Sequence, residues 1–321
     1  MSPRASAQSE LYMDLPPPQW SEKSEKMVVV MGATGVGKSN LSIKLATQFS
    51  PAEILNCDKM QVYRGLDITT NKVPIEEQLG VPHHFLDQFD HTRGELSPHD
   101  YRSLGRSTLE EILSRGTLPI VVGGSNSFID ALVSDQYIVD PYVYWLESVS
   151  PKLSYNCCFL WVDVSLPVLY EYLDMRLDEM LQRGMFSELC EFYKFKYDNK
   201  YNNKSDSYVG IEKSIGVPEF EEYFHRFPPS RQLKSLEEKN LREMHFKKAV
   251  RAAKNNTCKL AKEQVGKIKL LRSIGWDIRR LDATETIKAI LASDYSSSAK
   301  MWEKDVFEPS VKIVNKFLEL D

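Results

Sequence analysis

The stretch MVVVMGATGVGKS, residues 27–39, indicates the fold of the chain more clearly than any other part of the sequence. Its opening residues are apolar with valines at their centre, which is typical of a strand buried on both faces. Residues 32–39 match the pattern G-x-x-x-x-G-K-[ST], and we predict a helix from Lys38 to Phe49. A glycine-rich turn between a strand and a helix is the context of a phosphate-binding P-loop.

The P-loop predicts a binding site for a diphosphate group. Glycines let the backbone curl so that its N–H groups point inward, and the positive end of the following helix also attracts an anion. Lys38 supplies a cation, and the hydroxyl of Ser39 is expected to bind Mg²⁺. The expected diphosphate-binding residues are Gly32, Ala33, Thr34, Gly35, Val36, Gly37, Lys38 and Ser39.

Further strands and helices are expected to alternate along the chain. Short apolar runs and helical spacing identify them. This order predicts an α/β fold, a P-loop NTPase-like parallel sheet flanked by helices, with a smaller helical lobe. The predicted elements are strands at 54–57, 119–122, 159–164 and 276–281, and helices at 101–115 and 310–320.

Composition divides the chain into four expected regions. Residues 1–26 hold three consecutive prolines among polar residues, so we expect a disordered tail. Residues 27–165 form the expected P-loop α/β core. Residues 166–267 are charged and compatible with long helices, which predicts a mainly helical substrate lobe. Residues 268–321 are expected to return to the core and end in a helix.

The overall composition is that of an ordinary globular protein. With 321 residues and 42% hydrophobic content, the chain can bury a sizeable core. The formal net charge of −4 gives no broad cationic surface for nucleic acid. The five cysteines lack zinc-binding spacing, and we interpret them as reduced thiols inside a cell. No apolar run is long enough for a membrane span or resembles a secretory signal, so we expect neither.

Carboxylates near the ends of two predicted strands are candidates to complete the phosphate site. Asp58 follows the run 54–57, and Asp163 lies in the run 159–164. Because the carboxyl ends of parallel strands share one edge of the sheet, we expect Asp58 to face the phosphates. A carboxylate there can hold Mg²⁺ or accept a proton from a nucleophile. The residues alone therefore leave a nucleotide hydrolase or a small-molecule kinase open.

Several blocks after Asp58 resemble the isopentenyltransferase family, which includes tRNA dimethylallyltransferases and the adenylate enzymes of cytokinin synthesis. The resemblance extends from Met27 to about Asp282 and rests on separate blocks in the family's order. These blocks read KMQVYRGLDITTNK at 59–72, VPHHFLD at 81–87 and GGSNSFI at 123–129.

Two branches of the family differ in their acceptor, which is an adenine within tRNA or a free adenine nucleotide. The tRNA branch typically carries Gly-Tyr-Arg-Gln, whereas residues 214–220 read SIGVPEF here. The segment NNTCKLAKEQ at 255–264, with Lys267 and Ile268, is similar to the plant adenylate enzymes. A zinc-binding extension is absent from the sequence as well. The resemblance thus implies a free nucleotide, with ATP and ADP favoured over AMP, and makes tRNA the alternative acceptor.

The resemblance also implies roles for individual residues. The P-loop would hold the diphosphate of dimethylallyl diphosphate, and Lys38 and Mg²⁺ would stabilise the charge that grows on it as the allylic bond breaks. Asp58 would accept the proton of the adenine N6 amine, while Thr34 would position the reacting groups. Ser125 would orient the diphosphate or the amine. Capping or metal binding by Asp58, and helix capping by Ser125, remain open.

Cations in the expected helical lobe are candidates for holding the acceptor phosphates. Arg176 and Asp178, expected at the start of a helix, are candidates for the adenine or the donor phosphates, but each is expected to be a solvated surface charge unless the fold turns it inward. His83 and His84 lack a third metal ligand at suitable spacing, so we expect both to form structural hydrogen bonds. The expected nucleotide-binding residues are Arg176, Asp178, Lys213, Arg251, Lys254 and Lys267.

The expected protein is therefore an adenylate dimethylallyltransferase that uses Mg²⁺. Its expected partners are dimethylallyl diphosphate and ATP or ADP, with no membrane and no tRNA, and we expect a monomer. By resemblance the plastid is the expected compartment, with the cytoplasm as the alternative. A small-molecule kinase and a non-catalytic nucleotide-binding module are the hypotheses from other classes.

Overall fold

A parallel sheet of six strands forms the centre of the protein in the computed structural model, which describes residues 25–137, 152–199, 209–229 and 235–319. The strand order is β3-β2-β4-β1-β5-β6, and every pairing is parallel. The predicted α/β fold with a P-loop NTPase-like parallel sheet is confirmed. The strands are β1 (Lys26–Gly32), β2 (Ala52–Asn56), β3 (His83–His84), β4 (Leu118–Gly123), β5 (Asn156–Asp163) and β6 (Ile278–Asp282).

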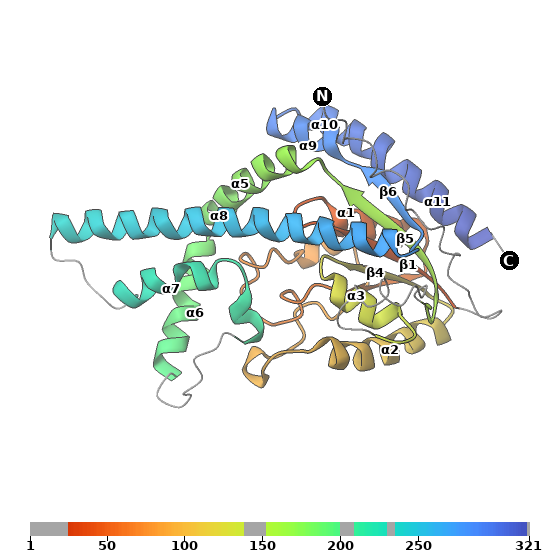
Figure 1. The fold of residues 1–321 in the computed structure, drawn as a ribbon, viewed down its shortest axis with the longest axis horizontal. Helices are drawn as coiled ribbons and strands as arrows, with labels where there is room; N and C mark the ends of the chain where they lie inside the picture. The colour runs from red at the N-terminus through yellow and green to blue at the C-terminus, as the bar shows by residue number, and fades with distance from the viewer. Residues whose placement is uncertain (1–24, 138–151, 200–208, 230–234, 320–321) are drawn as a thin grey trace, which may run out of the picture.

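Helices cover the sheet and extend beyond it (Figure 1). Helix α1 contacts β1, β2 and β4, and α8 also contacts β1. Residues 27–31 of β1 are consequently fully buried, as their apolar sequence predicts. The helices are α1 (Lys38–Gln48), α2 (Pro98–Ser114), α3 (Asn126–Val133), α5 (Leu166–Gln182), α6 (Met185–Asn199), α7 (Val217–Arg226), α8 (Leu236–Ser273), α9 (Thr284–Leu291), α10 (Tyr295–Trp302) and α11 (Glu308–Glu319).

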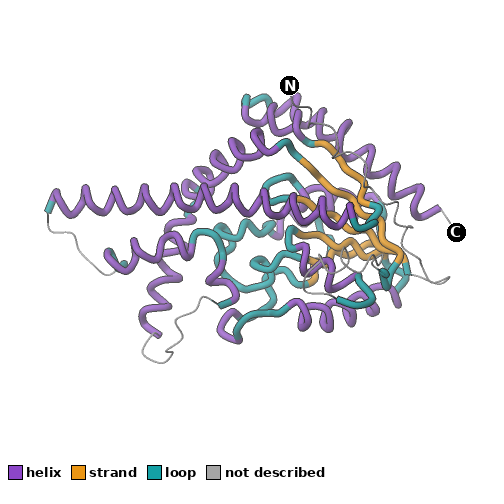
Figure 2. Tube along the Cα trace, in the orientation of Figure 1, coloured by secondary structure: helices purple, strands orange, loops and turns teal. Residues whose placement is uncertain are grey.

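A smaller group of helices stands apart from the sheet. Figure 2 shows the strands gathered on one side of the molecule, with α6, α7 and the outer half of α8 on the other. Aromatic rings hold this group together: Phe186 stacks on Phe224 with ring centroids 5.6 Å apart, and Tyr193 stacks on Phe224 at 4.5 Å. Helix α8 has 38 residues and links this group to the sheet.

Two sequence expectations concern the ends of these regions. The expected tail, residues 1–26, lies outside the described residues except for Glu25 and Lys26, and Lys26 already belongs to β1. The expected boundary at residues 267 and 268 falls inside α8, which continues to Ser273. No helix among the described residues is both long and apolar enough to cross a membrane.

Candidate functional site

The P-loop lies between β1 and α1, and its shape depends on a glycine at the helix start. Gly37 occupies the N-cap position of α1 with a φ of 92°, in the left-handed region that favours glycine. A Cβ atom there would also lie 2.6 Å from Cη2 of Trp302, at the end of α10. The C-terminal helices therefore pack directly against the phosphate-binding turn.

Lys38 points back into this loop and faces the other charged groups of the site. Its Nζ donates a hydrogen bond to the carbonyl of Ala33 at 2.6 Å. Burial lowers the pKa of Lys38 to about 8, the charge of Asp58 opposes this shift, and the charge of Arg176 adds to it. An anion bound here would stabilise the charged form of Lys38.

Asp58 follows β2 and faces the P-loop across β4. Its Oδ1 accepts hydrogen bonds from the backbone N–H of Met60 at 2.9 Å and of Gln61 at 3.3 Å. These bonds orient the carboxylate and leave Oδ2 without a hydrogen bond in the structure's described part. The other candidate, Asp163, is buried and accepts a hydrogen bond from Nε of Arg280 at 2.7 Å.

Ser125 supports the segment around Asp58. It occupies the N-cap position of α3, yet its side chain makes no capping bond. Its Oγ instead accepts a hydrogen bond from the backbone N–H of Lys59 at 2.9 Å. Its own N–H donates to the carbonyl of Cys57 at 3.3 Å. Ser125 thus holds the residues on both sides of Asp58.

Two adjoining cavities meet at Thr34, Asp58 and Arg176. The larger has a volume of about 400 Å³ and is also bordered by Lys38 and Ser39. The smaller has a volume of about 110 Å³. Much of its wall is apolar and comes from Leu173, Leu177, Met180, Ile215 and Leu260.

Arg176 is the expected nucleotide-binding residue that the fold turns toward the P-loop. It lies in the second half of α5 rather than at the helix start that we expected. Its Nη1 is 3.4 Å from Oγ1 of Thr34, and burial lowers its pKa. A guanidinium in this position can bind phosphate oxygens with fixed geometry.

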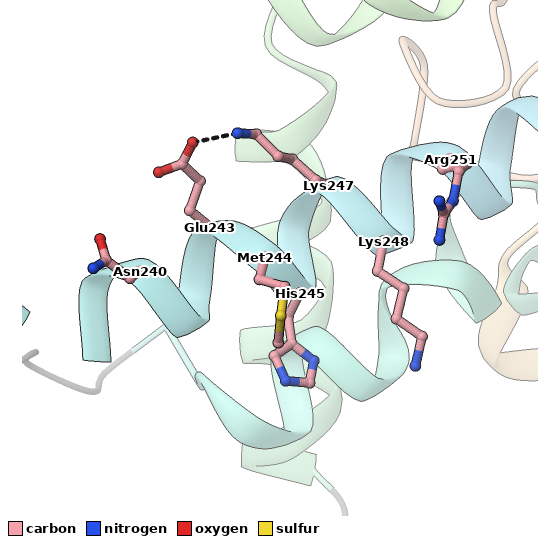
Figure 3. A pocket seen from close by; sticks show the side chains of 7 residues that line it. All are labelled: Asn240, Glu243, Met244, His245, Lys247, Lys248 and Arg251. Carbon is pink, nitrogen blue, oxygen red and sulfur yellow. Dashed lines mark ion pairs between the residues drawn. The ribbon is translucent and has the colours of Figure 1, made fainter. Parts of the chain in front are cut away.

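Asp178, Lys254 and Arg251 lie elsewhere. Asp178 is exposed and forms an ion pair with Lys254, with Nζ 2.7 Å from Oδ2, and neither side chain borders the two cavities. Arg251 is exposed on α8 beside a different pocket, together with Met244 and Lys248 (Figure 3). The fold therefore does not bring these three side chains to the P-loop.

The charges of Lys213 and Lys267 both act on Lys59, a residue that the sequence did not single out. Lys213 forms an ion pair with Glu95. Burial is the main cause that lowers the pKa of Lys59, Glu95 raises it, and Lys213 and Lys267 lower it further. Lys59 directly follows Asp58 in the sequence, and this position could have identified it as a candidate site residue. Three cations with one carboxylate form a positively charged cluster close to Asp58.

The oxygen groups near the P-loop fit a Mg²⁺ ion that is shared with a phosphate. Within the described ranges, no group of three His, Cys, Asp or Glu side chains could hold a metal by itself. Mg²⁺ usually binds one or two protein oxygens together with substrate phosphates and water. The hydroxyl of Ser39 and the carboxylate of Asp58 border the same cavity and suit that arrangement.

The two histidines form structural hydrogen bonds, as predicted. Nδ1 of His83 lies 2.8 Å from the carbonyl of Val81, and Nε2 of His84 lies 2.7 Å from Oε2 of Glu53. The five cysteines are all free. Neither feature adds a metal site or a disulfide.

The fold and the site define the class of this protein as a P-loop enzyme with a carboxylate facing the phosphate-binding turn. The family model described as IPP transferase matches residues 61–142 and 139–269. The chain belongs to the IPP transferase family, and the predicted family is confirmed.

Named relatives and solved structures agree with this membership. The chain is 52% identical to adenylate isopentenyltransferase of Humulus lupulus, over 90% of this chain and 89% of the relative. It is 47% identical to the chloroplastic adenylate isopentenyltransferase 8 of Arabidopsis thaliana, over 92% and 87% respectively. A eukaryotic dimethylallyltransferase acting on tRNA superposes with a TM-score of 0.74 at 25% identity, covering 92% of this chain and 80% of the other.

Proposed function

We propose that this protein is an adenylate isopentenyltransferase that transfers a dimethylallyl group from dimethylallyl diphosphate to N6 of a free adenine nucleotide. The observation that carries the proposal is the junction of the two cavities, where Asp58 and the P-loop residue Thr34 border both the polar and the apolar cavity. The larger cavity suits the donor diphosphate, and the apolar one suits the organic groups that react. The relatives named adenylate isopentenyltransferase support the same activity. The family resemblance implies that this activity is a step of cytokinin synthesis.

The proposed reaction is a substitution at C1 of the dimethylallyl group. A bond forms between N6 and C1, and the bond between C1 and the diphosphate oxygen breaks, so that diphosphate leaves with the electron pair. Asp58 takes the proton from N6. Lys38, Arg176 and the P-loop amides stabilise the charge that grows on the leaving diphosphate. Mg²⁺ bound to the diphosphate with Ser39 would neutralise part of the same charge.

We further propose that Lys59, Lys213 and Lys267 hold the acceptor phosphates. The positive cluster next to Asp58 supports this assignment, because the charges of Lys213 and Lys267 disfavour the charged form of Lys59, an effect that a bound anion would offset. ATP and ADP would bind better than AMP for this reason. Among the other expected residues, Asp178 and Lys254 pair with each other and Arg251 borders a different pocket, so these three receive no role here.

We propose that residues 166–267 form the substrate lobe, because Leu173, Ile215 and Leu260 from this range border the apolar cavity. We also propose a monomer and a plastid location. Relatives whose names include "chloroplastic" support the plastid, although another relative, at 40% identity, is named mitochondrial. Fluorescence microscopy of a tagged chain would test the compartment.

The activity is tested by mixing the purified protein with Mg²⁺, dimethylallyl diphosphate and one acceptor at a time. We expect N6-prenylated nucleotide by mass spectrometry with ATP and ADP, less with AMP, and none with unmodified tRNA. The structural likeness to the tRNA dimethylallyltransferase makes tRNA the second candidate acceptor. Product from tRNA alone would replace the proposal with that candidate, and no product from any acceptor would reject both.

A further inference from the structure

Gln264 of α8 is a buried side chain that the proposed mechanism does not use, and it joins two loops of the site. Its Oε1 accepts a hydrogen bond from the backbone N–H of Thr34 at 2.8 Å. Its Nε2 donates a hydrogen bond to the carbonyl of Gly124 at 3.0 Å. The first partner lies in the P-loop and the second in the turn after β4. One amide therefore connects α8, the P-loop and the β4–α3 turn.

The β4–α3 turn in turn holds the backbone around Asp58. Gly124 directly precedes Ser125, whose Oγ receives the N–H of Lys59 and whose N–H donates to Cys57. The amide of Asn126 also donates to the backbone carbonyl of Gln264, at 3.2 Å. The P-loop and the Asp58 segment are thus linked through a short, partly buried set of hydrogen bonds that has Gln264 at its centre.

We propose that Gln264 is a positioning residue, which fixes the P-loop, and with it the donor diphosphate, relative to Asp58. The proposal rests on the proposed prenyl transfer for its catalytic consequence. Reacting groups must be held closely, since a displacement of about 1 Å can slow a reaction by about 100-fold. The N–H of Thr34 already donates to Gln264, so it would not be available to the diphosphate. Thr34 would contribute its hydroxyl to the site instead, and the backbone N–H groups of later P-loop residues would bind the diphosphate.

The chemistry of the contact requires a neutral amide. The backbone offers a donor at Thr34 and an acceptor at Gly124, and a glutamine side chain supplies one acceptor and one donor to match. A glutamate would replace the donating N–H by a carboxylate oxygen, so that two acceptors, this oxygen and the carbonyl oxygen of Gly124, would face each other. A methionine would fill similar space and form neither bond, so the N–H of Thr34 and the buried carbonyl of Gly124 would lose their partner.

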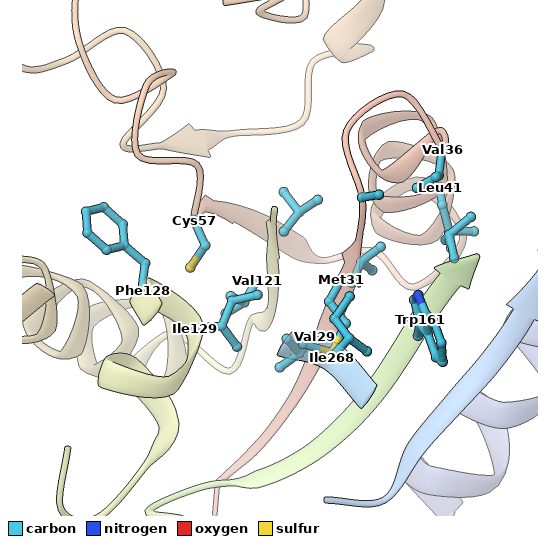
Figure 4. Packing of buried hydrophobic residues seen from close by; sticks show 14 of the residues in the cluster. Val29, Met31, Val36, Leu41, Cys57, Val121, Phe128, Ile129, Trp161 and Ile268 are labelled. Carbon is cyan, nitrogen blue, oxygen red and sulfur yellow. The ribbon is translucent and has the colours of Figure 1, made fainter. Parts of the chain in front are cut away.

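Packing keeps Gln264 in place. Ile268, one helical turn further along α8, is fully buried, and Figure 4 shows it beside Val29 and Met31 of β1. Gly124 leaves room for the amide, because a Cβ atom there would lie 2.5 Å from Nε2 of Gln264. Substitution of Gly124 by alanine should therefore displace the amide while the backbone stays in place.

The test compares Gln264→Met, Gln264→Glu and Gly124→Ala with the exposed neighbour substitution Glu263→Gln. We expect the first three to lower kcat by about 10- to 100-fold, with the KM for the nucleotide changed less than about twofold. Binding of inorganic pyrophosphate with Mg²⁺, measured by calorimetry, should weaken by about three- to tenfold. The double variant of Gln264→Met with Gly124→Ala should be no slower than the slower single variant.

Variants that melt like the wild-type protein and keep its kcat and its pyrophosphate affinity would overturn the proposal. The proposal would also be overturned if kcat, the KM and the pyrophosphate affinity all worsened together in proportion to a loss of thermal stability. That result would indicate that Gln264 has only a packing role. If the wild-type protein transferred no prenyl group, the proposed function would fail instead. The pyrophosphate measurement would then still decide whether Gln264 organises the P-loop.

Discussion

At the scale of single residues, the account depends on what Asp58 does with a proton. Two backbone N–H groups hold one carboxylate oxygen, and the carboxylate lies where the polar and the apolar cavity meet. A group held in this way is well placed to accept a proton from an amine in the apolar cavity. The same carboxylate also moderates the pKa of Lys38.

Substitution of Asp58 by asparagine tests this role. We expect kcat to fall by about 100- to 10,000-fold, because the amide keeps the shape and loses the proton acceptor. The KM for dimethylallyl diphosphate should change little. Steady-state kinetics would measure both, with Asp174→Asn on the exposed side of α5 as the matched control. An Asp58→Asn variant as fast as the control would show that the carboxylate is not the base.

The pKa of Lys38, lowered to about 8 mainly by burial, predicts a pH dependence for diphosphate binding. The charged form dominates below that pH and attracts the diphosphate, so binding raises the pKa and takes up a proton near pH 8. Pyrophosphate binding should therefore weaken as the pH rises from about 7 to about 9.

Calorimetry in buffers of different ionisation enthalpy would measure this proton uptake. The variant Lys38→Arg is the control, because arginine stays charged throughout this pH range. The proton uptake that we assign to Lys38 should be absent when pyrophosphate binds to the Lys38→Arg variant. Equal uptake by both proteins would assign the proton to another group, such as the ligand.

The sequence identified the residues of the P-loop and Asp58, because the motif and the strand ends determine where they lie. It did not separate Arg176 from Asp178. Successive residues of an α-helix are about 100° apart, so these two point to nearly opposite sides of α5. Only the packing of α5 decides which one faces the P-loop. Gln264 ends the block 255–264 that resembles the plant adenylate enzymes, but nothing predicted its buried position, since a glutamine inside a helix is usually exposed.

At the scale of elements, α6 fixes the loop that borders both cavities. The carboxylate of Glu188 accepts hydrogen bonds from the N–H of Ile68 at 3.0 Å, and from the N–H and the hydroxyl of Thr69 at 2.8 and 2.6 Å. The next residues, Thr70 and Asn71, line both cavities. Helix α6 therefore controls part of the wall of the site.

Substitution of Glu188 by glutamine should loosen this loop. We expect the free energy of unfolding to fall by about 2 kcal/mol, because charge-assisted hydrogen bonds are replaced by weaker ones. The KM for substrates should rise as well. Urea unfolding and kinetics would measure the two effects, with the exposed Glu191→Gln on the same helix as the control. Equal stability of the two variants would contradict a role for α6 in holding the loop.

The ends of elements were predicted less well than their existence. The helix expected at residues 101–115 begins at Pro98, because Ser97 and Asp100 form a capping box that the sequence contains. Strand β3 has two residues and is too short to give a periodic pattern. The expected boundary at residue 267 lies inside α8, since the helix continues along the sheet to bury Ile268 and Leu271.

At the scale of the whole molecule, the proposed acceptor site assembles from separate parts of the chain. Lys59 follows β2, Lys213 lies in the short turn Gly210–Lys213, and Lys267 lies on α8. Lys213 and Lys267 were among the expected nucleotide-binding residues, but no local pattern grouped Lys59 with them. Their mutual electrostatic effect on Lys59 follows only from the folded arrangement.

Loss of Lys267 should therefore change the choice among nucleotides. We expect Lys267→Ala to lower kcat/KM for ATP by about 10-fold and to change the value for AMP much less, because AMP lacks the outer phosphates. Lys269→Ala, an exposed position on the same helix, is the control. Equal losses for ATP and AMP would place Lys267 away from the outer phosphates.

The central claim is that the P-loop holds the prenyl diphosphate and that the acceptor purine reaches Asp58 from the other cavity. The most direct measurement is a crystal structure with ATP and an unreactive thiolodiphosphate analogue of the prenyl donor. The account predicts the analogue's diphosphate against Gly37 and Lys38, with N6 of the adenine within hydrogen-bonding distance of Asp58. ATP phosphates in the P-loop, with the adenine far from Asp58, would contradict it.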